Sequence, residues 1–360
     1  MFSRGRAALL ALVTPLAVLS AAACTPTTNT TATPAPWVTN FAPMGYSAAT
    51  GEVFGNRLGS DGAWNAYAIS VSDKTKIRSL TSGNALYGTE NTHRGVSDVS
   101  ADGKYMLMEV ERPDHFPCFN ATCVHVSEAA PGKGSYNQVW LATTDGTKAW
   151  QLTNLDADHA YGSFWARFDT TGNRIVFAEI MHPAGSPEYF GGEQLVTAQL
   201  TWTNGVPSMT GRVNLGNSSL FNEPYGYTAD GSAVIANSDQ LTPGLPGSAK
   251  IMLFPLDGSA PRQLTTALGT GYQEFAFLRP DHTGYVVSSG YQGWINGTDR
   301  WLISSATTNS TPVRVTHFAD YTTGHPQSGI SGGMAFVSNK QAAVGFEQNG
   351  VESTYLVAVP

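Results

Sequence analysis

The stretches VSADGKYMLM (99–108) and YTADGSAVIA (227–236) share one design, an apolar strand that runs into Asp-Gly and then into a second apolar strand. Asp-Gly between two apolar runs predicts a β-hairpin with a type I′ turn, which requires positive φ at both central residues. Looser copies of this hairpin follow at 46–54, 168–177, 278–282 and 336–340. Short strands that recur about every 40 to 60 residues predict stacked β-units, and a propeller is their usual closed form.

A second signature ends most of these units, namely a strand that finishes on an apolar residue followed by threonine. It occurs at 80–81, 152–153, 264–265 and 315–316, and a further apolar strand lies between the hairpin and this ending. Three strands and an outer fourth make one propeller blade. These anchors place the blades at 44–82, 95–154, 163–214, 223–266, 273–317 and 330–360.

The last blade reaches Pro360 after its third strand, which would leave a strand edge open to aggregation. The spare strand Trp37–Phe41 at the other end of the chain can complete that blade. The sequence therefore predicts an all-β fold over residues 37–360. We expect a six-bladed β-propeller of four-stranded antiparallel blades, with the ring closed by the N-terminal strand.

Residues from about 44 to 360 resemble the TolB-like family of β-propeller repeat proteins. The signature of that family is Ser-Pro-Asp-Gly before an apolar strand, with Leu-Thr at the end of the blade. This chain has Ala-Asp-Gly at 101–103 and 229–231, Arg-Pro-Asp at 279–281 and three Leu-Thr endings, and it departs from the pattern in blades one, three and six. The resemblance implies the propeller fold. Similar propellers serve as binding platforms, as accessory domains of peptidases and, more rarely, as lyases.

Composition and charge exclude one class of partner. The chain has 360 residues, of which 41% are hydrophobic and only 13% charged, enough apolar material for a large core. Its formal net charge is −7, and it contains no run of lysine and arginine that could neutralise phosphates. Nucleic acid is therefore not an expected partner. We also expect no cofactor and a monomer.

The N-terminus carries the pattern of a secretory signal. Arg4 and Arg6 precede an apolar run from Ala7 to Val18, and small residues lead to Cys24. The pattern resembles the bacterial lipoprotein signal, which implies removal of residues 1–23 and diacylation of Cys24. The alternative is an ordinary cleaved signal with a free Cys24. The apolar run is too short for a permanent membrane span.

Residues 24–36 are rich in threonine and proline, a composition typical of a polar tether that holds a domain away from a surface. Together with the lipoprotein signal, this tether predicts a protein of the cell envelope. We expect it on the extracytoplasmic side of a bacterial membrane, held there by its lipid anchor.

Cys118 and Cys123 lie five positions apart in the insertion of blade two. In an oxidising exterior such a pair predicts a small-loop disulfide. The alternative is a zinc site made of His115, Cys118, Cys123 and His125, whose spacing suits the metal. Export favours oxidation, and no hairpin of the metal-finger type is evident, so the disulfide is preferred and no metal is predicted.

Alignment of the repeats identifies one set of candidate ligand-binding residues. Counting seven residues back from the turn aspartate gives Glu223 in blade four and Glu274 in blade five. Innermost strands line the central channel, so these glutamates are predicted on neighbouring blades at one mouth, where propellers usually bind ligands. Two carboxylates can hold a cation or perform acid/base work.

The same count in blade two reaches Gly95, next to His93 and Arg94. We expect Arg94 to point into the same opening, and the alternative for the glutamates is that they cap backbone groups or pair with Arg94. His317 and His325, in the loop before blade six, are assigned to this mouth by the same hypothesis.

Two functions from different classes fit the sequence. The first is a membrane-tethered, non-catalytic binding module that engages a protein or a glycan, because no complete set of catalytic residues is recognisable. The alternative is a carbohydrate-active enzyme, a metal-dependent lyase or a hydrolase, that uses the residues of the channel mouth. The sequence identifies no catalytic residue for it.

Overall fold

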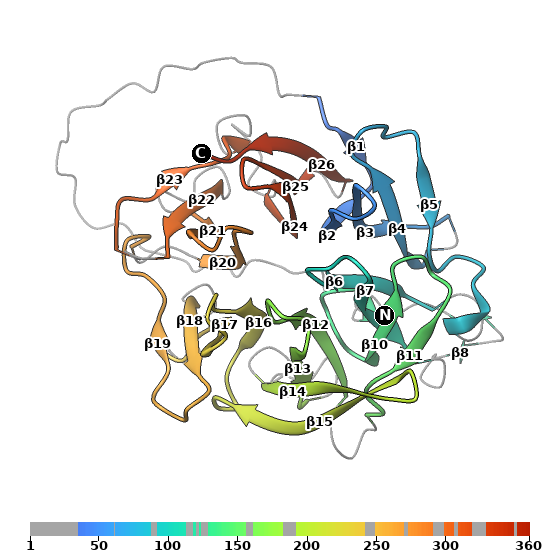
Figure 1. Cartoon of the computed structure of the whole chain (residues 1–360), viewed down its shortest axis with the longest axis horizontal. Coiled ribbons are helices and arrows are strands. Elements are labelled where there is room, and N and C mark those ends of the chain that lie inside the picture. The colour runs from blue at the N-terminus through green and yellow to red at the C-terminus, as the bar shows by residue number, and fades with distance from the viewer. Residues whose placement is uncertain are drawn as a thin grey trace. The chain divides into compact units, whose positions relative to one another are not determined.

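The computed structural model describes residues 35–360 except 61, 88–91, 113–117, 120–121, 124–128, 156–160, 183–191, 242–248, 270–272, 291–298, 306–308, 319–328 and 349–350. Six four-stranded antiparallel sheets and one two-stranded hairpin account for its strands. Figure 1 shows the six sheets as blades around a common centre. The predicted all-β, six-bladed propeller is confirmed, and the helical element named among the described residues is a single 3₁₀ turn, η1 (Ala85–Tyr87).

Each blade is given from its innermost to its outermost strand. Blade one contains β2 (Ala42–Ser47), β3 (Glu52–Leu58), β4 (Trp64–Ser70) and β5 (Ile77–Ser79). Blade two contains β6 (Arg94–Val99), β7 (Tyr105–Glu111), β10 (Asn137–Thr143) and β11 (Ala149–Gln151), with the hairpin β8 (Cys118–Phe119) and β9 (Thr122–Cys123) inserted. Blade three contains β12 (Gly162–Phe168), β13 (Arg174–Ile180), β14 (Glu193–Thr203) and β15 (Val206–Leu215).

Blade four contains β16 (Asn222–Tyr227), β17 (Ala233–Ser238), β18 (Lys250–Pro255) and β19 (Arg262–Gln263). Blade five contains β20 (Gln273–Leu278), β21 (Gly284–Ser289), β22 (Asp299–Ser304) and β23 (Val313–Arg314). Blade six contains β24 (Gly329–Ser338), β25 (Gln341–Gln348), β26 (Val351–Ala358) and, as its outermost strand, β1 (Val38–Thr39).

The N-terminal strand closes the ring, as the sequence predicts. β1 pairs antiparallel with β26, and the backbone amides of Trp37 and Asn40 donate to the carbonyl oxygens of Thr354 and Glu352 at 2.8 and 2.7 Å. Phe41, two residues after the end of β1, is fully buried in a cluster with residues of the first and last blades. The closing strand is shorter than the predicted segment 37–41, but Phe41 anchors it in the core.

The turn between the two inner strands differs from the predicted type I′. In blade two the amide of Gly103 donates to the carbonyl oxygen of Ser100, and Gly103 has a φ of +70°. Asp102 is not among the residues with positive φ. Its carboxylate instead accepts hydrogen bonds from Ser100 Oγ and the amide of Lys104. Only the last position of the turn needs the left-handed conformation, and His282 adopts it in blade five with a φ of +61°.

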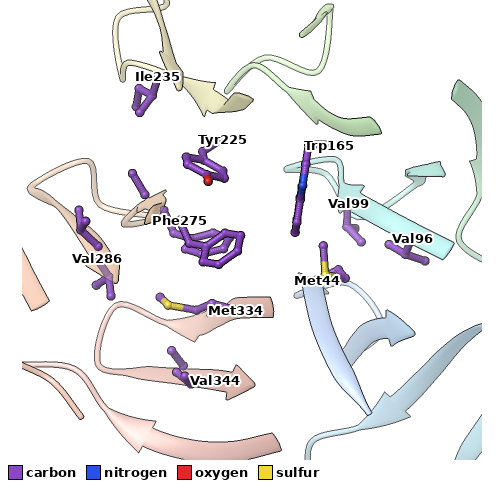
Figure 2. Close-up of a cluster of buried hydrophobic side chains, with 14 of the residues drawn as sticks. Met44, Val96, Val99, Trp165, Tyr225, Ile235, Phe275, Val286, Met334 and Val344 are labelled. Carbon is purple, nitrogen blue, oxygen red and sulfur yellow. The ribbon is translucent and has the colours of Figure 1, made fainter. Parts of the chain in front are cut away.

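Each innermost strand contains a register shift where its pairing with the second strand is interrupted. Such bulges re-aim side chains. Figure 2 shows five side chains at or beside these shifts gathered between the blades. They are Met44, Trp165, Tyr225, Phe275 and Met334, and each is at most 7% exposed. We call these five residues the plug, because they fill the centre of the propeller with apolar groups.

Blade three carries an arm that reaches blade two. Its outer strands β14 and β15 meet at Asn204 and Gly205, whose φ values of +52° and +77° are those of the type I′ turn. Near this tip, the ring of Trp202 lies 5.1 Å from that of Tyr105 and 5.7 Å from that of Trp150. The outer hairpin of blade three is therefore braced against the outer surface of blade two.

The described residues belong to one compact unit. The signal segment 1–23 lies outside the described residues, as do all but the last two residues of the tether 24–36, so both stay predictions. Within the described part of the chain, none of the helices has the length and the apolar character needed to cross a bilayer.

Candidate binding site at the channel mouth

The plug forms the floor of what we call the N-terminal mouth, the end of the channel at which the six innermost strands begin. Its three aromatic rings pack together. The ring centre of Phe275 lies 5.5 Å from that of Trp165 and 5.4 Å from that of Tyr225. Trp165 and Phe275 both have a φ of +53°. For a residue other than glycine this conformation costs about 1–3 kcal/mol, and the surrounding packing must hold it in place.

Glu223 and Glu274 occupy the same register position on adjacent blades. Glu223 in β16 lies opposite Asn237, and Glu274 in β20 lies opposite Ser288. Each glutamate is the second residue of its innermost strand, so both lie at the N-terminal mouth. Glu274 directly precedes the bulge at Phe275, whereas Pro224 lies between Glu223 and the bulge at Tyr225.

The two glutamates have different partners. Glu223 is only 6% exposed, and one of its carboxylate oxygens accepts a hydrogen bond of 2.9 Å from the hydroxyl of Tyr225. Glu274 is half-buried, and its negative charge interacts electrostatically with the buried guanidinium of Arg300. Burial lowers the pKa of Arg300 to about 10, while the charges of Glu274 and Glu352 oppose this shift. Arg300 is therefore a cation at neutral pH.

Arg300 connects the mouth to the plug. In the strand register, Ser288 lies between Glu274 on one side and Arg300 on the other, so the three form a row across blade five. The guanidinium donates to the hydroxyl of Ser288 and, at 3.3 Å, to the carbonyl oxygen of Gly333 in blade six. It also lies 5.7 Å from the ring centre of Phe275. Sequence reasoning missed Arg300, because only strand pairing places it beside Glu274.

His93 and Arg94 engage blade one. Arg94 is 4% exposed, and its Nη1 donates to the carbonyl oxygen of Thr81 at 3.0 Å. The Nδ1 atom of His93, which is 3% exposed, accepts a hydrogen bond of 3.0 Å from the amide of Trp64. Thr81 and Trp64 both belong to blade one, so these contacts fasten blade two to it.

His317 follows β23 and is exposed, at a pocket between blades five and six. His325 lies outside the described residues. The predicted site residues thus occupy three surroundings. Glu223 and Glu274 lie at the N-terminal mouth. Arg94, the first residue of β6, and His93 before it lie at the same end of the channel, but their side chains are engaged with blade one. His317 lies at the junction of blades five and six.

A second buried charged group, not predicted from the sequence, joins blades two and three. Glu109 is 2% exposed, and its carboxylate accepts hydrogen bonds from the amides of Trp165 at 2.9 Å and Gly132 at 2.8 Å. Burial raises the pKa of Glu109. Arg167, 3% exposed, donates to the carbonyl oxygen of Ser97 and lies 5.0 Å from the ring centre of Trp165. These contacts support the plug.

The two cysteines of blade two lie opposite each other in the hairpin of β8 and β9. The Cα atoms of directly opposed residues in an antiparallel pair lie about 4.5–5.5 Å apart, within the range that a disulfide spans. The disulfide stays a prediction. Cys24, His115 and His125 lie outside the described residues. Among the residues that are described, no group of three or more His, Cys, Asp and Glu is arranged to hold a metal ion.

No protein-family model and no curated protein matches the chain. Among solved structures, one assigned to TolB from Agrobacterium tumefaciens is similar over 89% of this chain and 90% of its own, with 14% identity and a TM-score of 0.51. A puromycin hydrolase is similar over 90% of this chain and 52% of its own, with 14% identity and a TM-score of 0.51. A puromycin-hydrolyzing peptidase of Mycobacterium tuberculosis is similar over 89% of this chain and 52% of its own, with 11% identity and a TM-score of 0.50.

This chain therefore spans about half the length of the two hydrolases and nearly the whole of the TolB structure. At these identities the likeness concerns the fold alone. It confirms the resemblance to TolB-like propellers that the repeats indicate.

Proposed function

We propose that this chain is a membrane-tethered, extracytoplasmic propeller that binds a protein or a glycan at its N-terminal mouth without catalysing a reaction. One observation carries the proposal. Glu223 and Glu274 stand at the same register position of adjacent blades, directly beside a closed apolar floor. A mouth of this form suits a ligand that is held against the end of the channel and does not enter it.

The surroundings of the two carboxylates suit recognition. Tyr225 fixes Glu223 through its hydroxyl, and the row of Glu274, Ser288 and Arg300 offers a half-buried carboxylate backed by a buried cation. Charges held in place by neighbours lose little conformational freedom when a partner docks, which favours affinity. The tethering part of the proposal rests on the signal segment, Cys24 and the threonine- and proline-rich residues that follow it.

The proposal is tested with Glu223→Gln and Glu274→Gln, which remove charge but keep the side-chain shape. The matched control is Asp257→Asn, in the turn between β18 and β19 at the opposite end of the channel. The immobilised proteins are exposed to solubilised envelope extract, and retained proteins and released sugars are identified. We expect the wild type and Asp257→Asn to retain the same partner, and both glutamate variants to retain at least about tenfold less.

Melting temperatures separate recognition from folding. The proposal requires Glu223→Gln to melt close to the wild type, because its amide oxygen still accepts the hydrogen bond from the hydroxyl of Tyr225. Glu274→Gln removes a charge that offsets the burial of Arg300 and is expected to melt lower, so its binding is measured at a temperature at which it is folded. If Glu223→Gln unfolds several degrees earlier, or if folded Glu274→Gln binds like the wild type, the proposal fails. If the purified protein carries a stoichiometric divalent ion that is lost on substitution of His93 or His317, the metal-dependent enzyme replaces it.

A further inference from the structure

A pocket of about 320 Å³ lies at the junction of blades five and six, and its lining includes neither Glu223 nor Glu274 nor any residue of the plug. The residues of its wall that matter for the argument are Trp37, Val315, Phe318, Tyr355, Leu356 and Val357. We call it the seam pocket. Figure 1 shows β23 and the end of β26 near the C-terminus, and β1 beside the first part of β26.

The outer edge of β26 is only partly covered. β26 has eight residues, whereas β1 has two and lies opposite Ser353 and Thr354. Continuing the register of β1 and β26 toward the N-terminus would place Pro36 opposite Leu356. Proline has no backbone N–H and cannot donate to a strand ladder, so the pairing stops there.

Leu356 lines the seam pocket together with Ala35 and Trp37 of the segment that leads into β1. Glu352 and Thr354 use their outward carbonyl oxygens to accept hydrogen bonds from the segment around β1. Outward and inward positions alternate along an antiparallel strand, so Leu356 is the next residue whose N–H and C=O point outward. Among the described residues, no backbone hydrogen bond outside the strand ladders involves Leu356.

Most of the residues that line the seam pocket are apolar, Thr316 and His317 are its polar side chains among the aliphatic and aromatic ones, and none of the lining residues is acidic, lysine or arginine. The ring of Phe318 lies 5.1 Å from that of Tyr355 and stacks on Phe346 at 4.3 Å, so aromatic packing supports the pocket from behind. A free strand edge beside an apolar pocket is the arrangement by which β-strand addition binds an extended peptide. Backbone hydrogen bonds give affinity, and the pocket selects one side chain.

We propose that the seam pocket and the free edge of β26 bind an extended segment of a partner protein. The segment adds a strand along Leu356–Ala358, continues the existing pairing of β1 with β26, and inserts one uncharged apolar side chain into the pocket. Continuity with β1 favours a peptide as the occupant, since only a polypeptide offers N–H and C=O groups at the spacing that the open edge requires.

The first test varies the ligand. The probe is a fluorescein-labelled, C-terminally amidated heptapeptide of alternating threonine and valine with a central phenylalanine. Its binding to the wild-type chain is followed by fluorescence anisotropy. Two control peptides carry N-methyl groups on alternate backbone amides, one control for each edge of the strand, and a third has alanine in place of the phenylalanine.

We expect the probe to bind, one N-methylated peptide to lose binding and the other to retain it, and the alanine peptide to bind at least about tenfold more weakly. Equal binding of both N-methylated peptides would show that no strand pairing occurs. Absence of probe binding up to about 1 mM, far weaker than a specific peptide site, would also overturn the proposal.

The second test varies the protein. Val315→Asp places a charge in the pocket wall, and Val313→Asp is the matched control, because Val313 is 47% exposed in β23 and does not line the pocket. We expect at least about tenfold weaker binding for Val315→Asp and none of this loss for Val313→Asp. Equal affinities of the two variants would contradict the proposal. Because the peptide controls use the wild-type chain, the test remains decisive even if Val315→Asp fails to fold.

Discussion

The outer edges of blades three and six show two ways to end a sheet. Blade three ends in the ten-residue strand β15, which carries Pro207, a bulge at Gly211 with a φ of +59°, and the charged Arg212. Proline, bulges and charges are the usual features that keep an exposed strand from pairing with another chain. Blade six ends in the two-residue strand β1, and β26 behind it presents Leu356, Val357 and Ala358 without any such feature.

The difference indicates which edge is available to a partner. β15 is protected along its length, and its hairpin is already engaged with blade two through Trp202. Among the described residues, β1 and the adjoining Trp37 and Asn40 pair with residues 352–354 of β26, and the seam pocket lies beside Leu356 and Val357. An edge that is open, apolar and adjacent to a pocket is suited to strand addition, whereas a protected edge is not.

Removal of β1 from blade six should lower the unfolding free energy more than any change to the edge of blade three. A chain that begins at Ala42 lacks the closing strand and the fully buried Phe41, and we expect it to lose more than about 4 kcal/mol of unfolding free energy. A chain that begins at Ala35 is the matched control, because it keeps β1. Urea unfolding measures the difference. Equal midpoints for the two chains would mean that β1 does not hold the ring closed.

Truncation of the arm of blade three should have a smaller effect. Trp202→Ala removes ring contacts with Tyr105 and Trp150, and we expect a loss of about 1–3 kcal/mol, since each aromatic pair contributes about 0.5–1.5 kcal/mol beyond its buried area. Val206→Ala, on the same hairpin and 54% exposed, is the control. If the two variants unfold at the same urea concentration, the arm does not brace blade two.

The smallest loss of unfolding free energy is expected for a change at Asp230, in the turn between β16 and β17 of blade four. Hydrogen bonds from Thr228 Oγ1 and from the amide and hydroxyl of Ser232 lower the pKa of Asp230 to about 2 from its ordinary value of 3.8. Because the folded pKa is the lower one, the stabilisation is present above 3.8 and is lost as the pH falls toward 2. The group is exposed, so we expect about 1 kcal/mol or less.

Asp230→Asn tests the direction of this pH dependence of stability. Unfolding free energies of the wild type and of the variant should differ most at neutral pH and converge near pH 2. A difference that grows as the pH falls would show that the carboxylate is not held in its ionised form by these hydrogen bonds.

Local signals in the sequence carry most of the fold. The hairpins around Asp102 and Asp230 are recognisable because turn residues and apolar alternation act over a few neighbouring positions. Strand counting then leaves one blade a strand short and the segment 37–41 spare, which is enough to predict ring closure. The same counting puts Glu223 and Glu274 in one register, since both lie seven residues before the turn.

The surroundings of those residues come from the tertiary structure alone. A bulge of one residue decides whether Trp165 and Phe275 point toward the channel, and no local signal marks it. Arg300 meets Glu274 because three strands pair in register, although the two residues are far apart in the chain. Pro36 leaves Leu356 open only because β1 and β26, from opposite ends of the sequence, are paired. Turn and strand preferences are local, whereas burial, partners and open edges depend on which distant segments the ring brings together.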